Sequence, residues 1–292
     1  MPPLDPGVRT AYLERLGLEA EPPSAEALAR LHRAHTERVP YETLWIHLGE
    51  GWDIDQAGSA ARVATRGRGG YCFHLNGAFG ALLADLGYEV RRHVGGVHGP
   101  DGPAPGDMTN HLVLTVRGLP SDRNPGGRWY VDAGLGDALH EPLPLEPGRY
   151  RQGPFLLALD QAPGDVADWH LAHDPSGSFP GMAWRAAAAG MDAFAARHTW
   201  LSTSPESGFV RVLTVQRRDA TGADVLRGLV LRRVGDGAAE TTLGTAGDLF
   251  DALGDVFALD PGHLDPAARR ALWERVHTAH LAWRAATAPA PP

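Results

Sequence analysis

The spacing of apolar residues changes once along this 292-residue chain, close to Gly87, and this change sets the class of fold. Ahead of Gly87 apolar side chains recur at helical intervals; after it they alternate or run with β-branched and aromatic residues, as strands do. The predicted helices of the first part are 8–18, 25–38, 61–66 and 72–86. The predicted strands are 88–97, 111–116, 128–133, 155–159, 169–172, 209–216 and 226–234, and the later helices are 191–198, 249–257 and 266–286. This order predicts an α+β protein of three packed subdomains.

The composition fits a protein with a hydrophobic core and no cross-links. Apolar residues make up 43% of the chain and charged residues 21%, which is unlike a disordered protein. Cys72 is the single cysteine, so no internal disulfide can form. No run approaches the roughly 18 apolar residues that span a bilayer, and the first residues do not resemble a secretory signal. We therefore expect a cytoplasmic location and no membrane partner.

The charged residues exclude several kinds of chemistry. All 27 basic residues are arginines, so no lysine can act as a Schiff base, a P-loop cation or a general base. The net charge of −8 argues against a nucleic-acid partner. The pairs Arg217-Arg218 and Arg232-Arg233 are interpreted as exposed strand ends. The irregular spacing of the histidines in 170–174 predicts no metal site there.

Cys72 is the candidate nucleophile of the chain. It follows a flexible Gly69-Gly70-Tyr71 turn and opens the predicted helix 72–86. Backbone N–H groups at a helix N-terminus stabilise a thiolate and can lower a cysteine pKa to about 3.5–7.5. A free cysteine is also commonly a small buried apolar residue. Cys72 alone leaves both interpretations open.

A base and a carboxylate to orient it could come from two neighbouring strands. His111 begins the predicted strand 111–116, and Asp132 lies inside 128–133, where an unpaired charge is costly. If these strands pair antiparallel, Asp132 comes to lie beside His111, with Cys72 facing both from the preceding helix. A histidine that only completes a core hydrogen bond explains His111 equally well at this point.

Three segments resemble the signature segments of the arylamine N-acetyltransferase family. They are Arg68-Gly-Gly-Tyr-Cys72-Phe, Asn110-His111-Leu-Val-Leu and Tyr130-Val-Asp132-Ala-Gly-Leu-Gly136. The stretches 38–44 and 203–209 resemble further family segments, in the same order. The resemblance therefore covers roughly residues 8 to 260, and it assigns the three residues Cys72, His111 and Asp132 as a catalytic triad.

The resemblance also implies a fold and a reaction. The fold would be an N-terminal helical bundle in 1–87 that ends in the helix of the active-site cysteine, a β-barrel in 88–190 and an α/β lid in 191–285, followed by a disordered tail in 286–292. The triad would be of the cysteine-protease type. The reaction would be ping-pong acyl transfer from acetyl-CoA, or another acyl-CoA, through a cysteine thioester to an arylamine or arylhydrazine-type amine. It implies no tightly bound cofactor and no metal.

Two positions depart from the family pattern, and both bear on substrate binding. His74 stands where the family usually has glutamate, and Leu135 stands where it typically has phenylalanine. In the family this phenylalanine borders the acceptor pocket, so the leucine would enlarge the pocket and remove an aromatic face. This predicts a different or bulkier acceptor, or weak activity on simple anilines. His74 either holds the active-site helix in another way or is an ordinary hydrogen-bonded side chain. The expected substrate-binding residues are Tyr71, Phe73, His74, Leu135 and Val97.

Three alternatives to the plain acetyltransferase remain. The first is an amide synthase that takes its acyl chain from an acyl carrier protein. The second is a thiol hydrolase or a transglutaminase-like enzyme, which uses the same order of cysteine, histidine and aspartate. The third is a binding module without catalysis; an intact triad argues against it, because a buried aspartate without a task costs stability.

Overall fold

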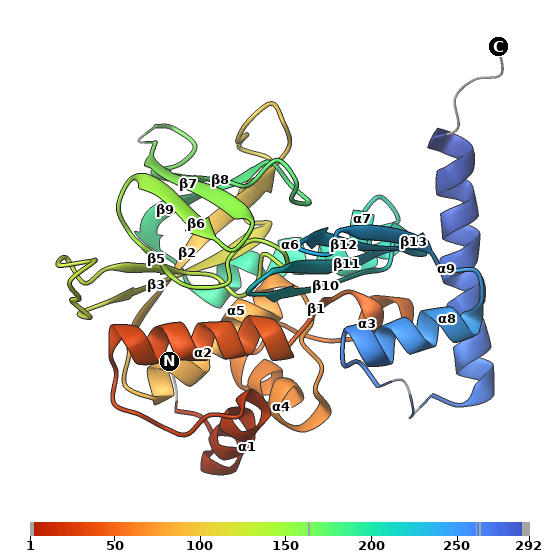
Figure 1. Cartoon of the computed structure of the whole chain (residues 1–292), viewed down its shortest axis with the longest axis horizontal. Helices are drawn as coiled ribbons and strands as arrows, with labels where there is room; N and C mark the ends of the chain where they lie inside the picture. Colours follow the sequence, from red (N-terminus) through yellow and green to blue (C-terminus); the bar gives the residue numbers. More distant parts are fainter. Residues whose placement is uncertain (1–2, 163, 261, 263, 288–292) are drawn as a thin grey trace.

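In the computed structural model, which describes residues 3–162, 164–260, 262 and 264–287, helices cover two antiparallel β-sheets (Figure 1). The first part of the chain is mainly helical, as the sequence predicts. Its helices are α1 (Pro6–Leu16), α2 (Ala25–Arg38), α3 (Leu44–His47), α4 (Gln56–Arg66) and α5 (Cys72–Asp85). Ser24 caps α2, since its hydroxyl accepts the backbone N–H of Ala27 at 3.0 Å.

Helix α5 lies at the centre of the molecule, so its position decides where the site can be. All of its residues from Cys72 to Leu83 are buried. Phe73, Leu75 and Phe79 pack into the largest hydrophobic cluster, together with side chains of α1, α2 and the strand that begins at His111. Because this helix is apolar all round, it is held on every side and presents its first residue in a fixed place.

The larger sheet supplies the second part of the fold and curls into a nearly closed barrel (Figure 1). Its strand order is β5-β4-β3-β2-β9-β8-β7-β6, and every neighbouring pair is antiparallel. The strands are β2 (Glu89–His98), β3 (His111–Arg117), β4 (Trp129–Val131), β5 (Leu143–Pro144), β6 (Gly148–Gln152), β7 (Phe155–Gln161), β8 (Trp169–Ala172) and β9 (Gly181–Ala188). Stacked aromatic rings help to fill its interior, with Trp184 between Trp169 and Tyr130.

The smaller sheet has the order β1-β10-β11-β12-β13 and takes its first strand from the helical part of the chain. Its strands are β1 (Tyr41–Glu42), β10 (Thr214–Asp219), β11 (Gly222–Arg227), β12 (Val230–Gly235) and β13 (Ala239–Thr242). The helices around it are η1 (Met191–Phe194), α6 (Ala195–Thr203), α7 (Gly208–Arg211), α8 (Ala246–Asp251), the π-helical turn η2 (Ala252–Val256) and α9 (Pro266–Thr287). Tyr41 pairs with Gln216 and Glu42 with Val215. The α+β class with a barrel is confirmed, whereas the exact subdomain boundaries stay a prediction.

Several predicted elements are wrong in detail. Residues 209–216 are not one strand, because α7 occupies their first part. Residues 226–234 are two strands, β11 and β12, joined by a tight turn at Gly228, whose φ of +60° is a backbone conformation that glycine adopts without strain. Strands β6 and β9 were not predicted at all. The predicted disordered tail 286–292 begins within α9, and 288–292 lie outside the described residues.

The prediction that the two arginine pairs are exposed strand ends is wrong for Arg218, whereas Arg232 is exposed within β12. Arg218 is only 1% exposed, and its guanidinium lies 4.6 Å above the ring of Phe155. It donates hydrogen bonds to the carbonyl oxygens of Gln152 at 2.7 Å, Ala138 at 3.1 Å and Gly222 at 2.9 Å. This one side chain therefore ties the smaller sheet to the barrel.

None of the helices in the described part of the chain is long and apolar enough to cross a bilayer.

Candidate active site

Cys72 is the first residue of α5, directly after the turn that the sequence singled out. The backbone N–H groups of His74 and Leu75 both donate to the carbonyl of Tyr71, at 2.9 and 3.0 Å. The N–H of Tyr71 donates in turn to Nδ1 of His74 at 3.3 Å. A helix leaves the N–H groups of its first residues unpaired, so those of Cys72 and Phe73 face outward beside the sulfur. This end of a 14-residue helix favours negative charge on Sγ.

Gly134 leaves room for the nucleophile. A Cβ at this position would lie 2.8 Å from Cα of Cys72 and 3.0 Å from Nδ2 of Asn76. Both contacts are closer than carbon and nitrogen atoms tolerate. The segment after β4 can therefore approach the start of α5 only because residue 134 has no side chain.

His111 and Asp132 come together through the pairing of β3 with β4. His111 is the first residue of β3, and Asp132 follows directly after β4 rather than lying inside a strand, as the sequence had suggested. The antiparallel register, with Leu114 opposite Val131, places the two side chains side by side. His111 Nε2 lies 2.8 Å from Asp132 Oδ2, and both residues are at most 2% exposed.

The carboxylate of Asp132 is fully supplied with hydrogen-bond donors. Besides His111, Oδ2 accepts the hydroxyl of Tyr130 at 2.9 Å, and Oδ1 accepts Nδ2 of Asn76 at 2.7 Å and the N–H of Gly134 at 3.0 Å. These donors offset the cost of burying a charge. The sequence analysis missed Asn76 and Tyr130. Asn76 lies four residues after Cys72, on the same face of α5, and this spacing was the available signal.

The surroundings of His111 favour its charged form. Burial opposes the imidazolium, but the negative charges of Asp132 and Cys72 and their hydrogen bonds outweigh it, and together they raise the pKa of His111 to about 10. Because Nε2 faces Asp132, Nδ1 is the nitrogen left for the sulfur. The arrangement therefore favours a protonated imidazole beside the sulfur of Cys72.

The triad opens into a cleft of about 400 Å³ between the barrel and the smaller sheet. Two of the predicted substrate-binding residues, Val97 and Leu135, line it. Its other lining residues include Tyr41, Asn110, Phe179, Arg197, Trp200, Phe209 and Gln216. The absence of an aromatic side chain at Leu135 leaves this wall aliphatic, on the side of the cleft nearest Gly134.

The other three predicted substrate-binding residues do not line the cleft. Tyr71, Phe73 and His74 are completely buried behind Cys72. The hydroxyl of Tyr71 lies 2.5 Å from Nδ1 of His198, and the ring of Phe73 packs on Phe194. These contacts fix the start of α5 from behind, so the structure brings the three residues to the nucleophile but not to the substrate space.

His74 lies within a cluster of aromatic rings. Its ring meets those of Trp45 and Trp52 edge to face, with centroids 5.3 and 5.8 Å apart. Burial, followed by the charges of Arg62 and His198, lowers its pKa well below the usual value, so the ring is neutral. A neutral ring can accept the N–H of Tyr71, and His74 thereby caps the helix that carries the nucleophile.

Comparison with known proteins identifies the family of the chain. The family model described as N-acetyltransferase matches residues 24–261. The chain belongs to the arylamine N-acetyltransferase family. An arylamine N-acetyltransferase of Mycolicibacterium smegmatis is 32% identical to it over 264 residues, which cover 87% of this chain and 92% of the relative. The resemblance seen in the sequence is thus confirmed, and the chain is an acyltransferase.

Solved structures of arylamine N-acetyltransferases share the fold. The enzyme of Mycobacterium marinum in complex with CoA superposes with a TM-score of 0.80 at 28% identity, and the match covers 92% of this chain and 98% of that chain. The Salmonella typhimurium enzyme gives a TM-score of 0.78 at 24% identity. One curated relative has a different name: Proansamycin X synthase of Amycolatopsis mediterranei is 30% identical over 159 residues, which cover 52% of this chain and 58% of the relative.

Proposed function

We propose that this arylamine N-acetyltransferase-family enzyme moves an acyl group from a CoA thioester to an arylamine or arylhydrazine-type amine, through a thioester on Cys72. One observation carries the proposal. The sulfur lies at a helix N-terminus beside a histidine that the buried Asp132 holds in its charged form, at the base of an open cleft. The complex of the Mycobacterium marinum relative with CoA supports CoA as the carrier of the acyl group.

In the first half-reaction, the thiolate of Cys72 attacks the carbonyl carbon of the acyl-CoA and forms a carbon–sulfur bond. The negative charge moves to the carbonyl oxygen, and we assign the N–H groups of Cys72 and Phe73 as its donors. The bond to the sulfur of CoA then breaks. The departing thiolate takes the proton from His111, which becomes neutral while Asp132 keeps its orientation.

In the second half-reaction, the amine nitrogen attacks the thioester carbonyl. Neutral His111 accepts a proton from the amine, and the bond to Sγ of Cys72 breaks as the amide is released. The enzyme returns to a thiolate beside an imidazolium, so no net proton or electron is left over. Since both half-reactions use one cleft, the donor must leave before the acceptor can bind.

Intact-protein mass spectrometry tests the thioester. The enzyme is incubated briefly with acetyl-CoA, malonyl-CoA or a longer acyl-CoA, next to the variant Cys72→Ala. We expect one acyl group on the parent and none on the variant, and hydroxylamine should remove it. Because the sequence contains a single cysteine, no other thiol can take over. No adduct on a folded parent, or an equal adduct on the variant, contradicts the proposal.

A second candidate is an amide synthase that takes its acyl chain from an acyl carrier protein. The match to Proansamycin X synthase and the aliphatic wall at Leu135 favour it. An acylated carrier protein offered in place of the acyl-CoA separates the two: faster acylation of Cys72 from the carrier would favour the synthase. The hydrolase alternative predicts that the acetyl-enzyme decays equally fast with and without an amine.

A further inference from the structure

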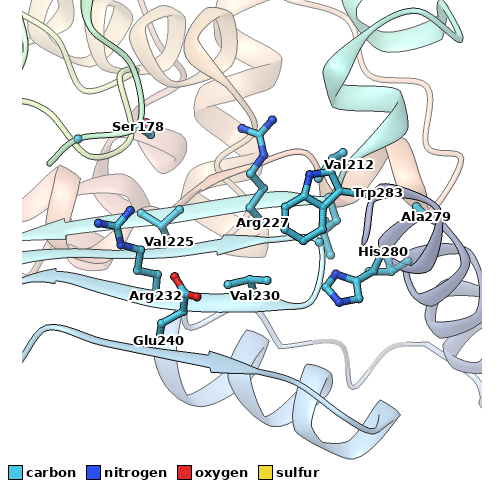
Figure 2. A pocket seen from close by; sticks show the side chains of 14 residues that line it. Ser178, Val212, Val225, Arg227, Val230, Arg232, Glu240, Ala279, His280 and Trp283 are labelled. Atoms are coloured by element: carbon cyan, nitrogen blue, oxygen red, sulfur yellow. The ribbon is translucent and has the colours of Figure 1, made fainter. Parts of the chain in front are cut away.

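A second cavity, of about 410 Å³, lies next to the cleft of Cys72, between the smaller sheet and the C-terminal half of α9 (Figure 2). We call it the β11–α9 cavity. Valines of β11 and β12 form its floor, and Trp283 of α9 closes one side. The apolar residues that line it are Val212, Leu213, Val225, Val230, Val276, Ala279 and Trp283. A cavity of this size can hold a substantial organic group.

One polar side chain in this cavity has an unmet hydrogen bond. His280 is only 5% exposed, and its Nε2 has no hydrogen-bond partner among the described residues. Its ring points over Val230 into the cavity (Figure 2). Burial, followed by the charges of Arg284 and His277, lowers the pKa of His280, so the ring is neutral. Since buried polar atoms in proteins nearly always have a partner, this nitrogen is available for a hydrogen bond to a ligand in the cavity.

The cavity adjoins the cleft of the triad. Ser178, Val225 and Arg227 line both spaces. Arg227 lines both spaces and forms no ion pair within the described residues. A molecule that reacts at Cys72 can therefore extend past this arginine towards His280. The two spaces, of about 400 and 410 Å³, together far exceed what an acetyl group and a simple aniline occupy.

We propose that the β11–α9 cavity holds the far end of an extended substrate, a mainly apolar arm with one hydrogen-bonding group directed at His280. The proposal deepens the function given above and rests on it. The lining suits such an arm better than the nucleotide end of CoA, which carries several negative charges. Arg232 lies opposite Glu240 in the register of β12 with β13, so the two charges balance and leave Arg227 as the cation at the junction.

Such an arm can belong to the acyl chain of the donor or to the amine, and the two half-reactions distinguish these sources. The variant Ala279→Trp fills the cavity, and Thr278→Trp places the same side chain on an exposed position of the same helix that does not line it. Acylation of Cys72 is timed with acetyl-CoA and with decanoyl-CoA. Deacylation of the acetyl-enzyme is timed with aniline and with a 4-(aryl-alkyl)aniline.

We expect Ala279→Trp to slow the reaction of one extended substrate by about tenfold or more, while acetyl-CoA and aniline react as before. Thr278→Trp should change none of the four rates. If Ala279→Trp slows acylation by the extended acyl-CoA, the arm belongs to the donor. If it slows deacylation by the extended amine, the arm belongs to the acceptor. His280→Leu should weaken the use of an extended substrate with a terminal hydroxyl by about three- to tenfold, and leave its fully apolar counterpart unaffected.

Three outcomes would overturn the proposal. Equal rates of Ala279→Trp and the parent with all substrates would show that the cavity is not used. The cavity would also be shown to be unused if the parent reacted no faster with extended than with small substrates and His280→Leu changed none of these rates. Slower acylation of Ala279→Trp from acetyl-CoA, but not from S-acetyl-N-acetylcysteamine, would place the nucleotide of CoA there instead. If no substrate acylates Cys72 in the parent, the proposed function fails first, and this result is distinct from the other three.

Discussion

The buried amide of Asn76 is expected to hold the catalytic carboxylate in place, and Asn76→Leu tests this. The amide donates to Asp132 Oδ1 at 2.7 Å and to the carbonyl of Leu112 at 2.6 Å, and it accepts the N–H of Ala133 at 2.9 Å. Leucine has a similar volume but can make none of these bonds. The substitution leaves the N–H of Ala133 unpaired and removes one of the four donors to Asp132.

The size of the effect follows from these bonds. A buried group without a partner costs about 1–3 kcal/mol, and a hydrogen bond to a charged group contributes about 1.5–3 kcal/mol. Burial of the apolar leucine side chain offsets part of these two costs. We therefore expect Asn76→Leu to lower the free energy of unfolding by about 3 kcal/mol. For a chain of this size that corresponds to a fall in Tm of roughly 5–10 °C. Acylation of Cys72 should slow by at least about tenfold, because Asp132 no longer holds His111 rigidly.

Asn124→Leu is the matched control. Asn124 is as deeply buried as Asn76, but its Nδ2 donates only to the carbonyl of Arg128, at 2.7 Å, and it lies in a turn between β3 and β4. Urea unfolding gives the stability of both variants, and mass spectrometry of the acyl-enzyme gives the rate. If Asn76→Leu loses no more stability than Asn124→Leu and is acylated at the parent rate, the amide does not support the carboxylate.

Further predictions concern the triad and its surroundings. Because the raised pKa of about 10 keeps His111 charged near neutral pH, alkylation of Cys72 by iodoacetamide at pH 7 should be at least about tenfold slower in His111→Gln than in the parent; equal rates would contradict the pairing of His111 with Cys72. The stability from the imidazolium is complete below about pH 6.5 and is lost as the pH rises through about 10, so the Tm difference between the parent and His111→Gln should shrink over that range. Gly134→Ala should slow acylation by at least about tenfold, since its Cβ would meet Cys72 at 2.8 Å, while Gly126→Ala, with no neighbour nearer than 3.5 Å, should react normally. Arg218→Met removes the donor from three buried carbonyls and should lower the free energy of unfolding by about 3 kcal/mol, as measured in urea.

The sequence suggests that Cys72, His111 and Asp132 come together, as the structure places them, because each residue lies in a local pattern with its own physical signature. Cys72 opens a helix after a glycine turn, His111 opens an apolar strand, and Asp132 is a charge at the end of another strand. Short-range patterns make all three residues candidates, and only the resemblance to a family assigns them as a triad. His111 and Asp132 then meet because the strands β3 and β4 pair with each other. Pairing of strands that follow one another in the sequence is the commonest arrangement.

What the sequence does not predict depends on contacts between distant segments. The buried state of Arg218 could not be foreseen, because the carbonyls that bind it come from β6, β11 and the segment after Asp132. The same holds for His280. The spacing of apolar residues in α9 shows which face of the helix is apolar, but not which strands lie opposite that face. The hairpin at Gly228 was missed although Arg227-Gly228 interrupt the apolar run, because a single glycine within a strand pattern also fits a bulge.

The pairing of β1 with β10 has a consequence for how the enzyme is made. Thr43 and Thr214, which follow and begin these strands, bond to each other across 171 residues of chain. At about 5–20 residues per second, a ribosome needs on the order of ten to thirty seconds to synthesise that stretch. During this time the nascent chain already carries the cysteine and its helix, but it lacks the sheet that forms the opposite wall of the cleft. Newly made protein therefore acquires its nucleophile well before it acquires a place for the substrate, and acyl transfer can begin only after the last third of the chain has folded back onto the first.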